Sequence, residues 1–246
     1  KYDAHLTALF ARADAELNSY VVGLNKKVLE EAEESKKRFG EKVAGTNLTT
    51  EWRYNDDTGA SLGVTDCVVM NAHYADLVIL GQTNPDDKES TTPKDLAENV
   101  LLESGRPVLV VPYAGKFDDI GKRIMVAWNA GRESVRAVND SLQLLSEADR
   151  VLVVAFNPKK DSGDHGEIPC ADICHHLARH EIKAEAQHLV ARDIDVGNML
   201  LSAAADEGID LIVMGAYGQA RYRELVLGGA TREVLQHMTV PVLMSH

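Results

Sequence analysis

The sequence repeats itself at a constant spacing of 134 residues. The segment ADLVILG (residues 75–81) is matched by IDLIVMG (209–215), and GRPVLVV (105–111) is matched by TVPVLMS (239–245). Few positions are identical, but one register that holds across about sixty residues is hard to obtain by chance, and a repeat constrains the whole fold. The chain is therefore predicted to contain two homologous halves.

Each half is predicted to alternate strands with helices. Strands are expected at 49–54 and 183–189, and each is followed by a helix, a buried strand, a long loop, a second helix and a final strand opened by Pro107 or Pro241. Strands that alternate with helices form βαβ units and a parallel sheet. The predicted fold class is therefore α/β, with two tandem doubly wound domains that each hold a parallel five-stranded sheet flanked by helices.

The second half contains additional elements before these. RIMVAWN (123–129) is a predicted strand, and a helix through Leu145 and the strand RVLVVAF (150–156) follow it. In the first half, HLTALF (5–10) matches that last strand, and a charge-rich surface helix is expected at 26–45.

The first half starts late in the repeat. Lys1 corresponds to about Glu147, so in this sequence the first domain lacks its first strand and first helix. The first strand of a doubly wound sheet lies centrally, and we expect the natural polypeptide to have residues before Lys1 that supply it. The predicted domains are residues 1–116 and 121–246, joined by a linker near 115–121.

Composition limits the classes of partner. The 38 acidic residues outnumber the 26 lysines and arginines, and the net charge of −12 repels a phosphate backbone, so no nucleic-acid partner is expected. The apolar runs are strand-sized, far short of the roughly 20 residues that cross a bilayer, so no membrane segment is expected. Three cysteines, Cys67, Cys170 and Cys174, give no disulfide framework, which favours a cytoplasmic location.

A glycine-containing segment, GAYGQARYRELVLGGATREVL (215–235), joins a predicted strand to a helix expected to start at 228–231. A helix start presents free N–H groups that favour an anion, and the two adjacent glycines there would let the backbone approach a phosphate. Gly215 and Asn129 both follow strands, at the edge where open α/β sheets bind ligands. Spacing alone equally allows an ordinary loop, in which the glycines turn the chain and relieve crowding.

The pattern Gly215-x2-Gly218-x9-Gly228, followed by a helix and a closing VPVL strand, resembles the adenine-nucleotide loop of the universal stress protein superfamily, whose fold is adenine nucleotide alpha hydrolase-like. RIMVAWNAGRESVRAV (123–138) resembles that superfamily's opening strand and first helix. With the repeat, the resemblance implies a tandem member with two such domains. It implies a phosphate and ribose side made by Gly215, Gly218, Gly228, Gly229, Ala230 and Thr231, and a base side made by Ala127, Trp128, Asn129, Ala155 and Met214.

Three positions depart from the superfamily pattern. An aspartate usually ends the first strand, where this chain has Asn129; a serine or threonine usually follows the third glycine, where it has Gly229; and a small residue is usual at Trp128. Asparagine donates and accepts hydrogen bonds but offers no carboxylate. Trp128 is compatible both with stacking on a base and with filling the pocket itself.

The first half has lost most of the glycine loop. At the repeat spacing, the three later glycines become Asn84, Lys94 and Asp95, and only Gly81 is kept. An aspartate at the start of a helix repels a phosphate there. No nucleotide is therefore predicted in the first domain.

Two further groups of side chains have a functional and a structural interpretation. CADICHHLARH (170–180) holds two cysteines and two histidines at spacings that allow zinc on a helix face. They do not gather on one face, so an amphipathic helix is preferred and no metal site is predicted. Three arginines, Arg221, Arg223 and Arg232, lie near the proposed phosphates and could neutralise them, although surface arginines more often remain solvated.

The sequence carries no Walker A loop, no G-x-S-x-G elbow and no H-E-x-x-H motif, so it is not predicted to be an enzyme. The resemblance implies a cytoplasmic stress-response sensor or adaptor that binds ATP or a related adenine nucleotide, with or without Mg²⁺, through its second domain. It also implies that the final strands, 106–111 and 240–245, associate within one chain; exposed strand edges are compatible with a homodimer. The alternatives are a weak ATP hydrolase and a module that binds a small molecule other than a nucleotide.

Overall fold

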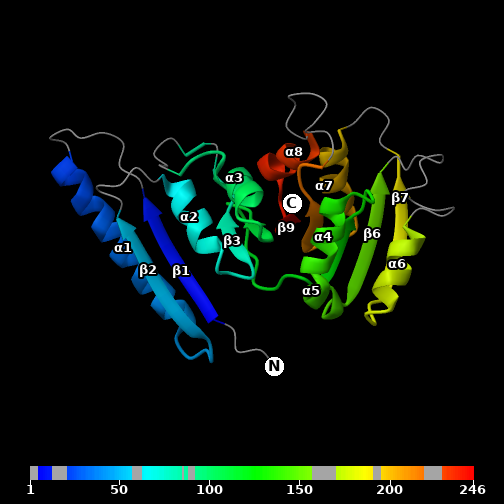
Figure 1. Ribbon diagram of the computed structural model, residues 1–246, viewed down its shortest axis with the longest axis horizontal. Helices are drawn as coiled ribbons and strands as arrows, with labels where there is room; N and C mark the ends of the chain where they lie inside the picture. Colours follow the sequence, from blue (N-terminus) through cyan, green and yellow to red (C-terminus); the bar gives the residue numbers. More distant parts are fainter. Residues whose placement is uncertain are drawn as a thin grey trace. The chain divides into compact units, whose positions relative to one another are not determined.

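The computed structural model describes residues 5–12, 21–56, 63–84, 86–87, 92–156, 170–190, 195–218 and 229–246. The chain divides into two compact units, Lys1–Asn71 with Glu89–Pro93, and Ala72–Lys88 with Lys94–His246. Figure 1 labels their helices and strands. Within the described ranges, no helix is both long enough and apolar enough to span a membrane.

The first unit is built on a parallel pair of strands. Its elements are β1 (His5–Arg12), α1 (Val21–Val43), β2 (Thr49–Asp56) and, up to Asn71, α2 (Val64–Ala72). Phe39 of α1 lies against Trp52 of β2, with ring centroids 5.8 Å apart, and this contact packs the helix on the strands. The strands predicted at 5–10 and 49–54 and the helix predicted at 26–45 are confirmed.

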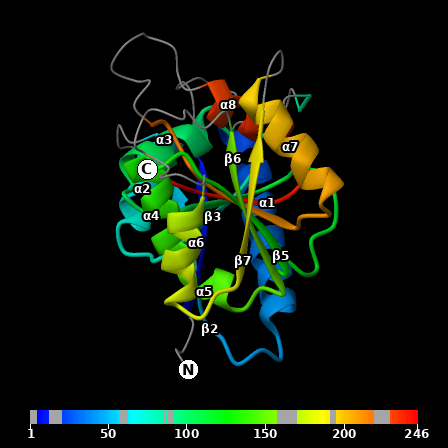
Figure 2. The ribbon, with the colours of Figure 1, turned by 90° about the vertical axis from the view of Figure 1, so that its right-hand side faces the viewer.

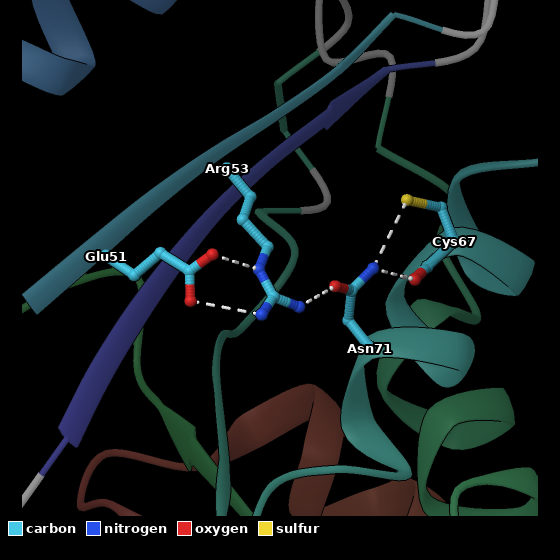
Figure 3. Close-up of polar contacts among 4 residues, drawn as sticks. All are labelled: Glu51, Arg53, Cys67 and Asn71. Atoms are coloured by element: carbon cyan, nitrogen blue, oxygen red, sulfur yellow. Dashed lines mark hydrogen bonds and ion pairs between the residues drawn. The ribbon is translucent and has the colours of Figure 1, made fainter.

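A polar network ties α2 to β2 in this unit (Figure 3). Arg53 donates from Nε and Nη2 to the two carboxylate oxygens of Glu51, at 2.8 and 3.0 Å, and from Nη1 to Asn71 Oδ1 at 2.7 Å. Asn71 Nδ2 donates in turn to the Cys67 carbonyl at 2.9 Å. Hydrogen bonding to Glu51 raises the pKa of Arg53 above its ordinary value, so this guanidinium keeps its charge.

The second unit is built on a seven-stranded sheet with the order β3-β4-β9-β8-β5-β6-β7. Every neighbouring pair is parallel except β4 and β9, which are antiparallel. The strands are β3 (Val78–Gly81), β4 (Val108–Val111), β5 (Arg123–Ala127), β6 (Arg150–Phe156), β7 (Ala184–Leu189), β8 (Leu211–Gly215) and β9 (Val242–Ser245).

Helices cover both faces of this sheet. They are α3 (Leu96–Glu103), α4 (Arg132–Asp140), α5 (Leu142–Ser146), α6 (Ala171–Ala178), α7 (Val196–Asp206) and α8 (Gly229–His237). Figure 2 shows α4, α5 and α6 on one side of β6 and β7, and α7 on the other. Ile124, Val151 and Leu211 point from neighbouring strands into one core with Val138 and Leu177 of the helices, which fixes the register of the sheet.

The five strands of the second half form the parallel sheet predicted from the sequence, in the order expected for a doubly wound fold with β5 at its centre. The predicted association of the final strands is also confirmed. The register pairs Val108 with Met244, Leu109 with Leu243 and Val110 with Val242. The two halves of the repeat therefore share a continuous sheet through β4 and β9.

In the described part of the first half, no five-stranded sheet of its own is formed. Its described strands form two pairs, β1 with β2 and β3 with β4, and the second pair extends the sheet of the second half. In the second half, β5 lies between β8 and β6 and joins them. Since no strand of the described first half occupies the corresponding place, β3 ends the sheet as an edge strand. The compact units consequently differ from the predicted domains 1–116 and 121–246, which follow the repeat and remain a prediction.

Candidate functional site

The site predicted from the sequence lies where β5 and β8 end. These strands are parallel neighbours whose register pairs Ala127 with Met214, so the loops that follow them start side by side. Trp128 N donates to the Val154 carbonyl at 2.8 Å and continues the pairing of β5 with β6 by one residue. Ala155 of β6 comes next at the same edge.

The residues expected on the base side differ in how much surface they offer. Ala155 is fully buried and Met214 is 6% exposed, so both belong to the core. Trp128 is half-buried and packs against the core cluster, whereas Asn129 is exposed. Ala127, Trp128 and Asn129 are therefore the base-side residues with surface available to a ligand.

Asn129 shapes the loop between β5 and α4. Its Oδ1 accepts a hydrogen bond from Gly131 N at 2.9 Å, the local side-chain contact that asparagine often makes in turns. Ala130, between them, has a φ of 57°, and Gly131 precedes the first residue of α4. A Cβ on Gly131 would lie 2.9 Å from Asn129 Oδ1, so this turn favours glycine.

Gly215 is where β8 meets the start of α4. A Cβ on Gly215 would lie 2.4 Å from Ser134 N and 2.5 Å from the Glu133 carbonyl carbon, closer than real atoms approach. This glycine is therefore required by packing between the strand and the helix. Glu133 is 5% exposed as a residue, and its Cβ also borders this contact.

The loop after β8 is tied to the start of α8. Tyr217, with a φ of 53°, donates from its backbone N–H to Thr231 Oγ1 at 3.3 Å. Thr231 is 4% exposed, so its hydroxyl serves this contact inside the protein. The backbone hydrogen bond from Ala216 N to the Ser245 carbonyl, at 2.9 Å, continues the pairing of β8 with β9. These contacts bring Gly218 and the first turn of α8 to the same edge of the sheet as Asn129.

The starts of α7 and α8 are neighbours. Asp195 caps α7 by accepting a hydrogen bond from Gly197 N at 2.7 Å, and its second oxygen lies 3.7 Å from where a Cβ of Gly229 would be. Gly229 is exposed and Ala230 is half-buried. Gly228, Arg221 and Arg223 lie outside the described residues, and Arg232 is exposed on α8.

Helix α6 has the amphipathic character preferred from the sequence. Ile173 and Leu177 are buried, Cys170 is buried at the helix start, and the rings of His176 and His180 contact each other edge to face at 5.0 Å. Burial and the neighbouring Cys174 raise the pKa of Cys170 to about 11. Among the described residues, no group of three or more His, Cys, Asp or Glu side chains is placed to hold a metal ion.

Sequence reasoning missed two acidic side chains at this site, Glu133 and Asp195. Glu133 falls in the predicted first helix and Asp195 in a predicted loop, and neither belongs to a glycine pattern. Their contacts with Gly215, Gly218 and Gly229 join residues far apart in the sequence, so only the folded sheet reveals them. For Glu133 the sequence did carry a signal, an acidic residue in the first turn of a helix, but such residues are common for helix stability alone.

Comparisons with known proteins agree with this fold. The model of the universal stress protein family matches residues 121–246. A universal stress protein of Synechocystis sp. is 50% identical over 182 residues, which cover 72% of this chain and 60% of that protein. One from Methanocaldococcus jannaschii is 38% identical over 45 residues, 18% of this chain and 28% of that protein. The chain thus spans less than two thirds of either curated relative.

Solved structures resemble the whole chain. A universal stress protein from Archaeoglobus fulgidus has a TM-score of 0.72 at 15% identity, covering 98% of this chain and 87% of that one. A functionally unknown protein from Pseudomonas aeruginosa has a TM-score of 0.53 at 19% identity, covering 98% and 81%. These likenesses concern the fold. Because the family model matches more than half of the sequence, the chain belongs to the universal stress protein family.

Proposed function

We propose that the second half of the chain binds an adenine nucleotide, ATP or a close relative, and acts as a sensor or adaptor in a stress response. One observation carries this proposal: the loops after β5 and β8 start side by side, and the hydrogen bond from Tyr217 N to Thr231 Oγ1 holds the first turn of α8 beside them. A helix start at the carboxyl edge of a parallel sheet is a favourable place for a phosphate.

The residues at this edge are compatible with such a ligand. Gly218 and Gly229 present bare backbone, and among the described residues Asp195 Oδ2 is the atom within van der Waals reach of a Cβ on Gly229. Trp128 and Asn129 have surface beside them for a base. The site would thus use backbone N–H groups for phosphates and a half-buried aromatic side chain for adenine. An adaptor is proposed rather than an enzyme because the sequence carries none of the catalytic motifs sought above.

The test compares the full chain with Gly229→Asp and Gly229→Ala in a thermal shift experiment with ATP and Mg²⁺. The new carboxylate would lie at the start of α8 and repel phosphates, as predicted for Asp95 in the first half. A Cβ alone meets Asp195 Oδ2 at an ordinary 3.7 Å, so Gly229→Ala is the matched control. Ligand at a hundredfold excess over its Kd stabilises a protein by about 2.7 kcal/mol.

We expect the unmodified chain and Gly229→Ala to gain thermal stability with ATP, and Gly229→Asp to gain none. Equal shifts in all three proteins would indicate that the ligand binds away from α8. No shift in any of them would favour the alternative function, a module that binds a small molecule other than a nucleotide. If binding occurs, phosphate release above the Gly229→Asp background would reveal the weak hydrolase.

A further inference from the structure

The Glu133 carboxylate lies between the two loops of the candidate site. Its side chain is 7% exposed, and Oε1 accepts a hydrogen bond from Arg132 Nε at 3.0 Å. Oε2 lies 3.3 Å from the place a Cβ would take on Gly131, and equally 3.3 Å from the place a Cβ would take on Gly218. The second oxygen therefore borders the loop after β5 and the loop after β8 at once.

Among the described residues, the surroundings of Glu133 compensate this negative charge only in part. Arg132 is the ion-pair partner in the described part of the chain, and its side chain is 80% exposed, so water screens that pair strongly. Oε2 has no hydrogen-bond partner among the described residues. The N–H groups in the first turn of α4 favour a negative charge at Glu133. Asp195, beside Gly229, adds a second charge of the same sign.

We propose that Glu133 is a specificity residue that makes affinity fall as the uncompensated negative charge of the ligand grows. Like charges repel, and the repulsion is stronger where burial reduces screening by water. Adenosine and AMP would then bind better than metal-free ATP, and ATP would be accepted mainly as its Mg²⁺ complex. This inference rests on the proposed function, because it concerns the same adenine site.

The test measures Kd by calorimetry for adenosine, AMP, ADP and ATP without divalent cations, and for ATP with Mg²⁺. It uses the full chain, Glu133→Gln and Glu147→Gln. Glutamine keeps the shape of glutamate and removes the charge. Glu147 is exposed at the end of α5, before β6 begins, so Glu147→Gln removes an equal charge at the opposite end of the strands.

In the unmodified chain we expect Kd to rise with each added phosphate and Mg²⁺ to tighten ATP binding but not adenosine binding. In Glu133→Gln, metal-free ATP should bind about tenfold more tightly, the effect of 1.4 kcal/mol less repulsion, and adenosine should bind as before. Glu147→Gln should behave like the unmodified chain.

Two results would overturn the inference. If adenosine and ATP bind the unmodified chain equally well, with no effect of Mg²⁺ or of Glu133→Gln, then Glu133 does not discriminate by ligand charge, while adenine binding stands. If no adenine ligand binds any variant, the proposed function fails and the inference fails with it. Should Glu133→Gln not fold, the phosphate series and the Mg²⁺ effect in the unmodified chain decide alone.

Discussion

Gly215 has a packing role that its repeat counterpart, Gly81, does not share. We predict that Gly215→Ala destabilises the protein by about 1–3 kcal/mol, because its Cβ would collide with the backbone of Glu133 and Ser134, and overpacking costs energy of this size. Urea unfolding followed by circular dichroism measures the change.

Gly81→Ala is the matched control, since Gly81 also ends a strand of the repeat but has no described residue within 4 Å of the place its Cβ would take. It should change stability by less than about 0.5 kcal/mol, as most open surface positions do. Equal losses in the two variants would mean that strand ends in general, and not the contact with α4, require glycine.

Cys170 should be protected from alkylation in the folded protein. Burial raises its thiol pKa to about 11, so at pH 8 about one thiol in a thousand is the reactive thiolate. We expect iodoacetamide to label Cys170 at least about a hundredfold more slowly in the native state than in denaturant, with sites assigned by mass spectrometry. The folded pKa is raised, so this group's contribution to stability is complete below the ordinary value of 9.0 and is lost towards pH 11. Rapid native labelling would contradict this.

At the residue scale, the structure gives two of the predicted site residues structural roles that the glycine pattern did not indicate. Gly215 was expected to face phosphate, and the structure gives it a packing reason of its own. Asn129 was expected beside the base, and its side-chain oxygen forms a turn. Whether either also contacts a ligand stays a prediction. A glycine pattern cannot separate the two causes, because the crowding atoms belong to an element far away in the sequence.

At the scale of elements, Asp210 joins the starts of two central strands. Its carboxylate accepts hydrogen bonds from Gly121 N at 2.8 Å, Lys122 N at 3.0 Å and Arg123 N at 3.1 Å, which fixes the chain as it enters β5. We predict that Asp210→Ala destabilises the protein by about 1–3 kcal/mol, the cost of leaving such groups unpaired. Thermal unfolding of the two proteins measures the difference.

The repeat again provides the control, because Asp76 occupies the equivalent position before β3. Asp76 is exposed, and the described part of the chain offers it no hydrogen bond. Asp76→Ala should therefore be nearly neutral. If both alanine variants lose the same stability, the contribution comes from the ends of these strands and not from the three hydrogen bonds.

Element types were largely predictable, whereas their neighbours were not. Hydrophobic runs predicted β6 at 150–156 and the strand that opens after Pro241, and both are confirmed. The strand at 75–81 was expected to be buried, and this was wrong: Ile79 is 56% exposed, while its repeat counterpart Val213 is fully buried. The same apolar pattern serves a central strand and an edge strand, and only the pairing with β5 distinguishes them.

At the scale of the whole molecule, the pairing of β4 with β9, here called the seam, covers the open side of the apolar strand β9. Val242, Leu243 and Met244 are all buried, and Gln82 supports the seam by donating from Nε2 to the carbonyls of Leu235 and Gln236, at 2.9 and 3.1 Å. The Oε1 atom of the same side chain accepts a hydrogen bond from Tyr113 N. Gln82 therefore links the end of α8 to the backbone just after β4.

We predict that residues 121–246, produced alone, fold and self-associate through β9. Without β4, the N–H and C=O groups of that strand are left open along one side, and such an edge pairs readily with another copy. Sedimentation velocity should detect a dimer of the fragment at micromolar concentration. A folded fragment that stays monomeric at tens of micromolar would show that β9 does not need a partner strand.

Because β4 and β9 are antiparallel, the strands on the two sides of this pairing run in opposite directions. β3 and β4 run against the five strands of the second half, so the end of β3 at Gly81 and the end of β8 at Gly215 lie at opposite edges. At the Gly81 edge the terminal carbonyls of α8 are held by Gln82, and their partial negative charge is unfavourable for an anion. A small ligand at one edge therefore could not also contact the other, because the length of a strand separates them.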